Sequence, residues 1–357
     1  MEEKGFTLRQ TSIAKGFACL LLLFHHLFYN SPEYYTLFVS VFNFGGVPLE
    51  CKVAPLGKVC VYMFLFLSGF GVSFVLERNR EKKNPWRISL RFVWKLMFGF
   101  WVIYLLFVPW QPLIGHQPYT SWKEIVLDLT GFCYFPGYGW LNGNTMNKTW
   151  WYISLALLCY VLTPLFDWLT EKTNWLGVLL SAGIIVGISG WLLPKDTIYF
   201  VAYLFGMMFQ KARIFDYFEK YRQSKNALTF IVPIAFLGVS VLAKLWNDAL
   251  FWFLPLMLCC ILFSFLCLSR IKYLSATLAF IGKHSANIFL FHTFLFRYMR
   301  NVFYAPKYSV LIYFIFLAVC LFVSAFIEKI KQWTRVNRLE KFVSEKIEGK
   351  SKKCVEY

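Results

Sequence analysis

The chain has 357 residues, of which 58% are hydrophobic and only 16% are charged. Soluble globular domains average about 45–50% apolar and about 25% charged residues, so this composition excludes a disordered chain and disfavours an ordinary soluble enzyme. The formal net charge of +18 would suggest a nucleic-acid partner for a soluble protein. Here most of the excess Lys and Arg lies in short runs between apolar segments, which is typical of multi-pass membrane proteins and does not predict nucleic-acid binding.

Apolar stretches of membrane-spanning length recur to the end of the chain and predict an all-α bundle of about ten transmembrane helices. The predicted spans are residues 13–30, 60–77, 89–108, 150–168, 175–193, 197–210, 228–244, 249–268, 280–299 and 308–327. With both termini in the cytoplasm, 28 of the 37 Lys and Arg residues fall on the inner side, as the positive-inside rule requires. We therefore expect a membrane domain over residues 1–327 and a basic cytoplasmic tail over residues 328–357 that forms an amphipathic or solvated helix.

Two of the predicted outer loops are long. Cys51 lies in residues 31–59 and Cys60 follows directly at the end of this loop; the two could form a disulfide, although the sequence does not show that they do. The chain has no CxxC pair, so no metal site is expected. Aromatic and polar side chains are frequent in residues 110–149, where they could stack on sugars or form the aromatic belt of a membrane interface. They include Trp110, His116, Phe132, Tyr134, Tyr138, Trp140 and Asn142, and the loop also holds Pro112 and Pro136.

The first span carries ionisable residues, which are expensive inside lipid and therefore indicate function. Lys15 and His26 are eleven residues apart, so they project from the same helix face at positions separated by about 16 Å along the axis. Lys15 would then lie near the inner interface and His26 near mid-membrane. Neutral imidazole can accept a proton near neutral pH, so His26 is a candidate general base, and a hydrogen-bonded structural histidine is the alternative. His25 reaches a neighbouring face, so at least one of the two rings should point into the bundle.

A second polar pair lies in the ninth span. Ser285 and His292 are seven residues apart and therefore share a helix face. They could line a pocket or support helix packing.

Basic residues flank the second and third spans on the predicted inner side. Arg78 and Arg80 follow the second span, and Arg91 and Lys95 begin the third, four residues apart on one face. These cations could anchor the helices at the interface by snorkelling, or they could hold the phosphates of a cytosolic ligand.

In their order and spacing these residues resemble the acyltransferase-3 family of integral membrane acyltransferases, which includes O-acetyltransferases of bacterial surface polysaccharides. Lys15 to His26 resembles the first-helix pattern of a basic residue, ten residues and a histidine, and residues 66–70 resemble the Leu-Ser-Gly-Phe signature of the second helix. Arg91 to Lys95 resembles the basic start of the third helix. Further matches are Trp151, Ser154, Tyr160 and Pro164 in the Trp-rich span and Gly282, Ser285 and His292 in the late Gly–Ser–His segment.

Two features depart from the family pattern. Ala156 and Leu157 stand where the family often has a pair of glutamates, and no hydrolase-like domain follows the tenth predicted span.

The resemblance implies a multi-pass enzyme of the plasma membrane that transfers an acyl group, most often acetyl from cytosolic acetyl-CoA, to a carbohydrate hydroxyl without a metal. His26 would be the general base, and Lys15 would support it while binding the anionic part of the donor. Further contacts to CoA would come from Arg78, Arg80, Arg91 and Lys95. The substrate pocket would include His25, Trp151, Ser154, Ser285 and His292.

Two other functions fit the same topology. A transporter or flippase would share the aromatic outer loops, but it usually needs a carboxylate deep in a span, and the sequence places none convincingly there. A non-enzymatic membrane subunit or sensor would use the paired histidines only for structure. The sequence leaves open the glycan acceptor, the choice between acetyl and succinyl, and the oligomeric state.

Overall fold

The computed structural model describes residues 5–29, 32–80, 84–114, 119–135, 139–140, 145–188 and 195–349. These residues form thirteen α-helices, several short 3₁₀ turns and two small antiparallel sheets. One sheet pairs β1 (Asn43–Phe44) with β2 (Val47–Pro48), and the other pairs β3 (Tyr134–Phe135) with β4 (Gly139–Trp140). The predicted all-α, polytopic fold class is confirmed.

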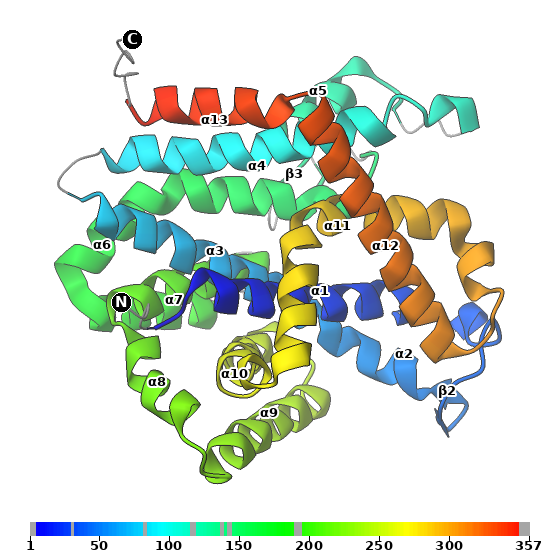
Figure 1. Cartoon of the computed structure of the whole chain (residues 1–357), viewed down its shortest axis with the longest axis horizontal. Coiled ribbons are helices and arrows are strands. Elements are labelled where there is room, and N and C mark those ends of the chain that lie inside the picture. Colours follow the sequence, from blue (N-terminus) through cyan, green and yellow to red (C-terminus); the bar gives the residue numbers. More distant parts are fainter. Residues whose placement is uncertain are drawn as a thin grey trace. The chain divides into compact units, whose positions relative to one another are not determined.

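The chain divides into two compact units, and the first combines residues 1–67 with 212–325. Its helix α1 packs against α11 and α10 (Figure 1). A capping box starts α1, because the Thr7 amide donates to the Gln10 side chain over 2.6 Å and the Gln10 amide donates back to the Thr7 hydroxyl, which satisfies two otherwise unpaired donors. The helices that lie in this unit are α1 (Leu8–Phe28), α2 (Leu49–Val53), α8 (Ile214–Gln223), α9 (Leu228–Trp246), α10 (Phe253–Leu266) and α11 (Lys272–Tyr304).

The second unit combines residues 68–211 with 326–357. Figure 1 shows α13, α4 and α6 lying side by side in this unit, and the contacts of α4 with both neighbours agree. The unit contains α4 (Pro85–Phe107), α5 (Trp122–Thr130), α6 (Trp151–Ile188), α7 (Ile198–Lys211) and α13 (Val336–Ile347). Two helices, α3 (Val59–Arg78) and α12 (Ser309–Trp333), begin in the first unit and end in the second.

Seven helical stretches within the described residues are long and apolar enough to cross a membrane. They coincide with seven of the ten predicted spans and begin at Leu8, Leu49, Pro85, Lys148, Leu228, Leu250 and Ser309. The other three spans fall on the 14-residue helix α7, on α11 and on the second half of α6. The multi-pass character is thus confirmed, whereas the count of ten and the orientation in the membrane stay predictions.

The helix α6 differs from the sequence expectation. One helix of 38 residues contains the fourth predicted span from Trp151 onward, the inner segment over residues 169–174 and the fifth predicted span as far as Ile188. That segment contains charged and polar residues but neither glycine nor proline, so no residue in it breaks the helix. Pro164 lies inside the helix without ending it, as proline can in membrane helices.

Large apolar side chains are exposed along α9, and Trp246 at its end has 93% of its surface accessible. An apolar surface of this extent is typical of a helix that faces lipid rather than water. The exposed residues include Ile231, Ile234, Phe236, Val239 and Leu242. This face supports the assignment of a membrane protein independently of helix length.

The expected tail begins inside a helix. Helix α12 continues past residue 327 to Trp333, and α13 follows after a short turn. Helix is present in this segment up to Trp333 in α12 and from Val336 to Ile347 in α13, and residues 350–357 lie outside the described part of the chain. The domain boundary at 327 stays a prediction.

Candidate active site

Two glycines bring α1 and α11 into close contact. A Cβ at Gly16 of α1 would collide with the backbone carbonyl of Leu278, and a Cβ at Gly282 of α11 would collide with that of Ser12. Small residues at such positions let membrane helices approach until their backbones touch. Side chains that follow along this helix pair therefore meet at short range.

The rings of two histidines, one from each helix, are in contact. The ring centroids of His26 and His292 are 4.7 Å apart, with an angle of 56° between the ring planes. His292 is fully buried, and its Nδ1 lies 2.9 Å from the carbonyl of Ile288 and 3.0 Å from that of Phe289. Since a carbonyl oxygen only accepts hydrogen bonds, Nδ1–H must be the donor, and the neutral ring keeps its lone pair on Nε2. Within the described residues this Nε2 has no hydrogen-bond partner.

The two residues on which the catalytic prediction rests share helix α1. His26 and Lys15 are both partly buried. No described residue hydrogen-bonds to the His26 ring, and no described carboxylate forms an ion pair with Lys15. One helix therefore presents an imidazole and an ammonium group that the described protein leaves available to other molecules.

His25 is held by neighbouring groups of the same unit. Its Nδ1 lies 2.8 Å from the carbonyl of Ala54, in the 3₁₀ turn over residues 54–58, and its ring stacks on Tyr29 at 4.9 Å. Gly57 allows this turn to approach the backbone of α1. His25 thus fixes the end of α1, and a role in binding substrate stays a prediction.

Ser285 is buried on α11, one turn after Gly282, and its hydroxyl donates to the Gly282 carbonyl over 2.8 Å. The hydroxyl oxygen keeps its capacity to accept a hydrogen bond.

Trp151 and Ser154 belong to the second unit. The Trp151 ring contacts Tyr199 at 5.2 Å and Tyr134 at 6.2 Å, so aromatic groups surround it. Ser154 is fully buried, and its hydroxyl donates to the carbonyl of Gly131, which ends α5. In the described structure this serine joins α6 to the turn after α5.

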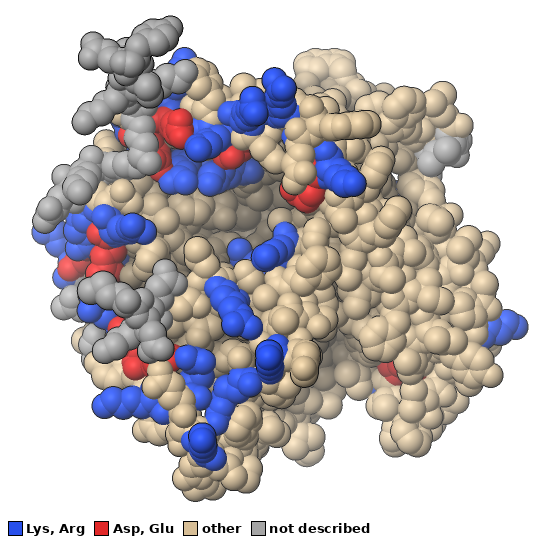
Figure 2. Space-filling model, in the orientation of Figure 1, with Lys and Arg blue, Asp and Glu red and all other residues tan. Residues whose placement is uncertain are grey.

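The four basic residues expected at a CoA phosphate also lie in the second unit. Arg78 and Lys95 are exposed, and Arg80 pairs with Glu171 over 2.6 Å. Arg91 pairs with the buried carboxylate of Glu348 at the end of α13. Figure 2 shows Lys and Arg side chains gathered along α13 and the adjoining part of α4. The structure thus places cations here but gives two of them carboxylate partners of their own.

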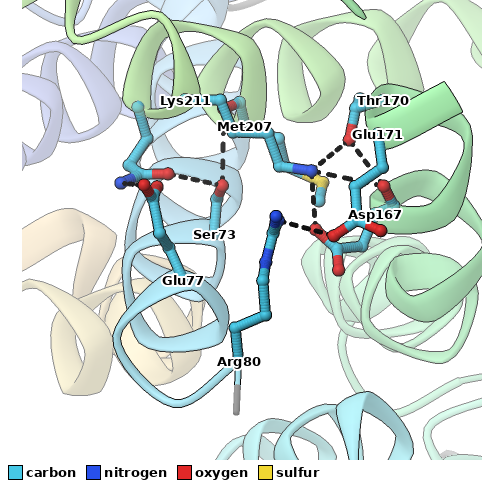
Figure 3. A network of polar contacts seen from close by, with 9 residues as sticks. Ser73, Glu77, Arg80, Asp167, Thr170, Glu171, Met207 and Lys211 are labelled. Carbon is cyan, nitrogen blue, oxygen red and sulfur yellow. Dashed lines mark hydrogen bonds and ion pairs between the residues drawn. The ribbon is translucent and has the colours of Figure 1, made fainter. Parts of the chain in front are cut away.

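A polar network beside these residues was not predicted as a site. Lys211 of α7 reaches α6, where its Nζ lies 2.7 Å from Asp167 and also contacts the hydroxyl of Thr170 (Figure 3). Ser73 donates to Gln210 over 2.7 Å, and Gln210 in turn donates to Glu77 of α3 over 2.9 Å. The sequence signal was Asp167 near the inner end of a predicted span.

The loop between α4 and α6 is organised by Asp128 of α5, which the sequence analysis did not single out. This fully buried carboxylate accepts hydrogen bonds from the hydroxyls of Tyr119 at 2.6 Å and Thr145 at 2.7 Å, and from the Met146 amide at 2.9 Å. Burial and the neighbouring Asp128 charge raise the pKa of the Tyr119 phenol, which keeps it a donor, and they raise the pKa of the Cys133 thiol to about 12. Of the aromatic and polar residues that could stack on sugars in this loop, His116, Tyr138 and Asn142 lie outside the described residues, as does Pro136.

Glu50 has a similar role in the first outer loop. Its carboxylate accepts hydrogen bonds from Ser40, from the Val41 amide at 2.9 Å and from Ser309 at 2.6 Å. Cys51 and Cys60 are buried and both carry free thiols in this structure.

Apolar helices with free imidazole and ammonium groups on one of them define an integral membrane protein with a polar site inside it. A family model described as an acyltransferase domain (Acyl_transf_3) matches residues 12–329. The chain therefore belongs to the acyltransferase-3 family and is a membrane acyltransferase, in agreement with the resemblance of its motifs. Comparisons with curated proteins and with solved structures gave no match.

Proposed function

We propose that the protein transfers an acyl group, in the first instance acetyl, from cytosolic acyl-CoA to a hydroxyl of a surface or lipid-linked glycan at the plasma membrane of a bacterium. The observation that carries this proposal is the partly buried His26 ring, which no described residue hydrogen-bonds, on the same helix face as Lys15. A membrane acyltransferase needs a base for its acceptor, and His26 is free to act as one.

The chemistry requires a base because an alcohol is a weak nucleophile. His26 takes the proton of the acceptor hydroxyl as its oxygen attacks the thioester carbonyl, and such general-base assistance contributes about 10²–10⁴-fold. The new carbon–oxygen bond replaces the carbon–sulfur bond, and the electron pair of that bond leaves with the CoA sulfur. The proton passes from His26 to this sulfur, so the products are an ester and free CoA.

Lys15 supplies positive charge near the cytosolic end of the same helix. A compact ammonium group suits a phosphate oxygen of the donor, while the thioester extends toward His26. Arg78 and Lys95, which are exposed, together with Arg80 and Arg91 would add to donor binding if their carboxylate partners exchange for phosphate. For Trp151 and Ser154 we likewise propose a place in the substrate pocket.

The test is acyl transfer by the purified protein in lipid. Radiolabelled acetyl-CoA is supplied with a glycolipid fraction from the source organism, and free thiol and O-acetyl ester are measured together. We expect both to form in equal amounts, and succinyl-CoA in a parallel reaction decides between donors. Ester formation without CoA release, or movement of glycan across vesicles without either product, would overturn the proposal. Mass spectrometry of surface glycans from a deletion strain then identifies the acceptor.

A further inference from the structure

His292 is the buried titratable group that the mechanism above leaves without a task. It lies on α11, 266 positions after His26 in the chain, and contacts the proposed base directly. We propose that His292 is a positioning residue for His26, whose Nε2 accepts a hydrogen bond from the protonated His26 ring during acyl transfer. This inference rests on the proposed function and adds a second residue to its machinery.

Hydrogen bonds to the backbone fix the tautomer of the His292 ring. The carbonyls of Ile288 and Phe289 both lie within 3.0 Å of Nδ1, and both can only accept. They hold the proton on Nδ1 and thereby keep Nε2 as a lone pair. The second ring nitrogen often sets the tautomer of a functional histidine in this way.

The Nε2 atom of His292 is buried without a hydrogen-bond partner among the described residues. A buried polar atom without a partner destabilises the folded state, so such atoms are rare in folded proteins and call for an explanation. The His292 side chain is fully buried and its Nε2 lacks a hydrogen-bond partner within the described ranges. The His292 ring contacts the His26 ring, with 4.7 Å between the ring centroids.

The protonated His26 ring requires a hydrogen-bond acceptor. When His26 takes a proton, both of its nitrogens become donors, and a donor buried without an acceptor is costly. In serine hydrolases a carboxylate meets this need, but no described carboxylate pairs with either histidine. The Nε2 of His292 is an acceptor on the facing helix, in a ring that contacts the His26 ring. The proton stays on His26 until the CoA sulfur takes it, so His292 changes neither its own charge nor the balance of the reaction.

The alternative is that the His292 ring only fills space. Two substitutions separate these roles, because His292→Phe keeps a ring but removes the acceptor, whereas His292→Gln provides an amide oxygen near the former Nε2. His284 of the same helix, whose Nδ1 lies 2.9 Å from Ser324, provides the matched control as His284→Gln.

The experiment compares kcat and KM for acetyl-CoA among the purified variants. We expect His292→Phe to lower kcat about 100-fold with KM unchanged, His292→Gln to recover at least tenfold of that loss, and His284→Gln to behave as wild type. In the His26→Ala background, His292→Phe should add little, because residues that act as a unit are not additive. Equal kcat values for His292→Phe and His292→Gln, or a change confined to KM, would overturn the inference.

A measurement on the unmodified protein covers the case in which His292→Phe does not fold. The chain has five histidines, so ¹⁵N-histidine labelling with assignment by single substitutions can report each tautomer. The inference requires Nδ1–H at His292, and a spectrum with the proton on Nε2 contradicts it. If wild type transfers acetyl and His26→Ala does not, while His292→Phe is fully active, the inference alone fails. If wild type shows no CoA-dependent transfer, the proposed function fails.

Discussion

The helix pair α1–α11 and the network around Asp167 differ in whether their ionisable groups have partners. In the network Lys211 pairs with Asp167 and Arg80 pairs with Glu171, so these four charges have partners of the opposite sign (Figure 3). In the helix pair His26 and Lys15 have none among the described residues. A paired buried charge is costly to break and therefore maintains structure, whereas unpaired ionisable groups inside a membrane are kept for function. Replacing a buried charge of the network should accordingly lower stability, whereas replacing His26 or Lys15 should lower activity.

The largest effect is expected where the helix pair itself is forced apart. Gly282→Leu places a side chain against the backbone of Ser12, so α1 and α11 can no longer approach. We expect loss of both the folded protein and all activity, measured by size-exclusion chromatography in detergent and by acyl transfer. The control is Gly238→Leu on α9, where a Cβ would meet open space. A well-folded, active Gly282→Leu protein would show that this contact does not position the site.

Breaking the network should reduce stability. Asp167→Ala leaves the Lys211 ammonium, which is 19% exposed, without its carboxylate, and loss of one partner of a buried pair costs about 3 kcal/mol. Thermal unfolding in detergent should show this loss, while KM for acetyl-CoA stays near that of wild type.

The matched control removes both charges of this pair. Asp167→Leu combined with Lys211→Met should recover most of the stability, because no charge is then left unpaired. If the double variant is as unstable as Asp167→Ala, the charge pair is not the cause of the loss.

Removing the ammonium from the helix pair should have a moderate effect on substrate binding. Lys15→Ala is expected to raise KM for acetyl-CoA about tenfold, which corresponds to about 1.4 kcal/mol, with the melting temperature unchanged. Lys15→Arg should keep most of the binding, and Lys220→Ala on the exposed face of α8 controls for a general loss of positive charge. A normal KM in Lys15→Ala would remove this residue from donor binding.

The smallest effect is expected for the exposed ion pair of the network. Arg80 and Glu171 are 51% and 40% exposed, and pairs in such surroundings contribute less than about 1 kcal/mol. Arg80→Ala should therefore leave thermal stability almost unchanged. A rise in KM for acetyl-CoA in this variant would support Arg80 at the phosphate, and an unchanged KM would exclude it.

The sequence was sufficient to locate the ionisable residues of α1 and α11, because an imidazole or an ammonium group within an apolar run is conspicuous. It could not predict that His26 and His292 touch, since that contact depends on how two helices far apart in the chain pack at Gly16 and Gly282. The signal for close packing was only a pair of small residues, which many apolar helices contain.

Charge and loop patterns were less informative than apolar runs. The polar residues 169–174 suggested a turn, but a helix can pass through such a segment when it holds no helix-breaking residue, and α6 does so. Asp128 was not recognised because carboxylates are common in loops. Its importance comes from burial and from the three donors that converge on it, and neither feature is visible in sequence.

The most direct test of the central claim is the rate of ester formation by purified His26→Ala protein, inserted in lipid and shown to melt like the wild type. With saturating acetyl-CoA and acceptor, we expect the rate to fall by 10²–10⁴-fold, with donor binding retained and with His284→Ala fully active. A His26→Ala protein that forms ester at the wild-type rate would contradict the account.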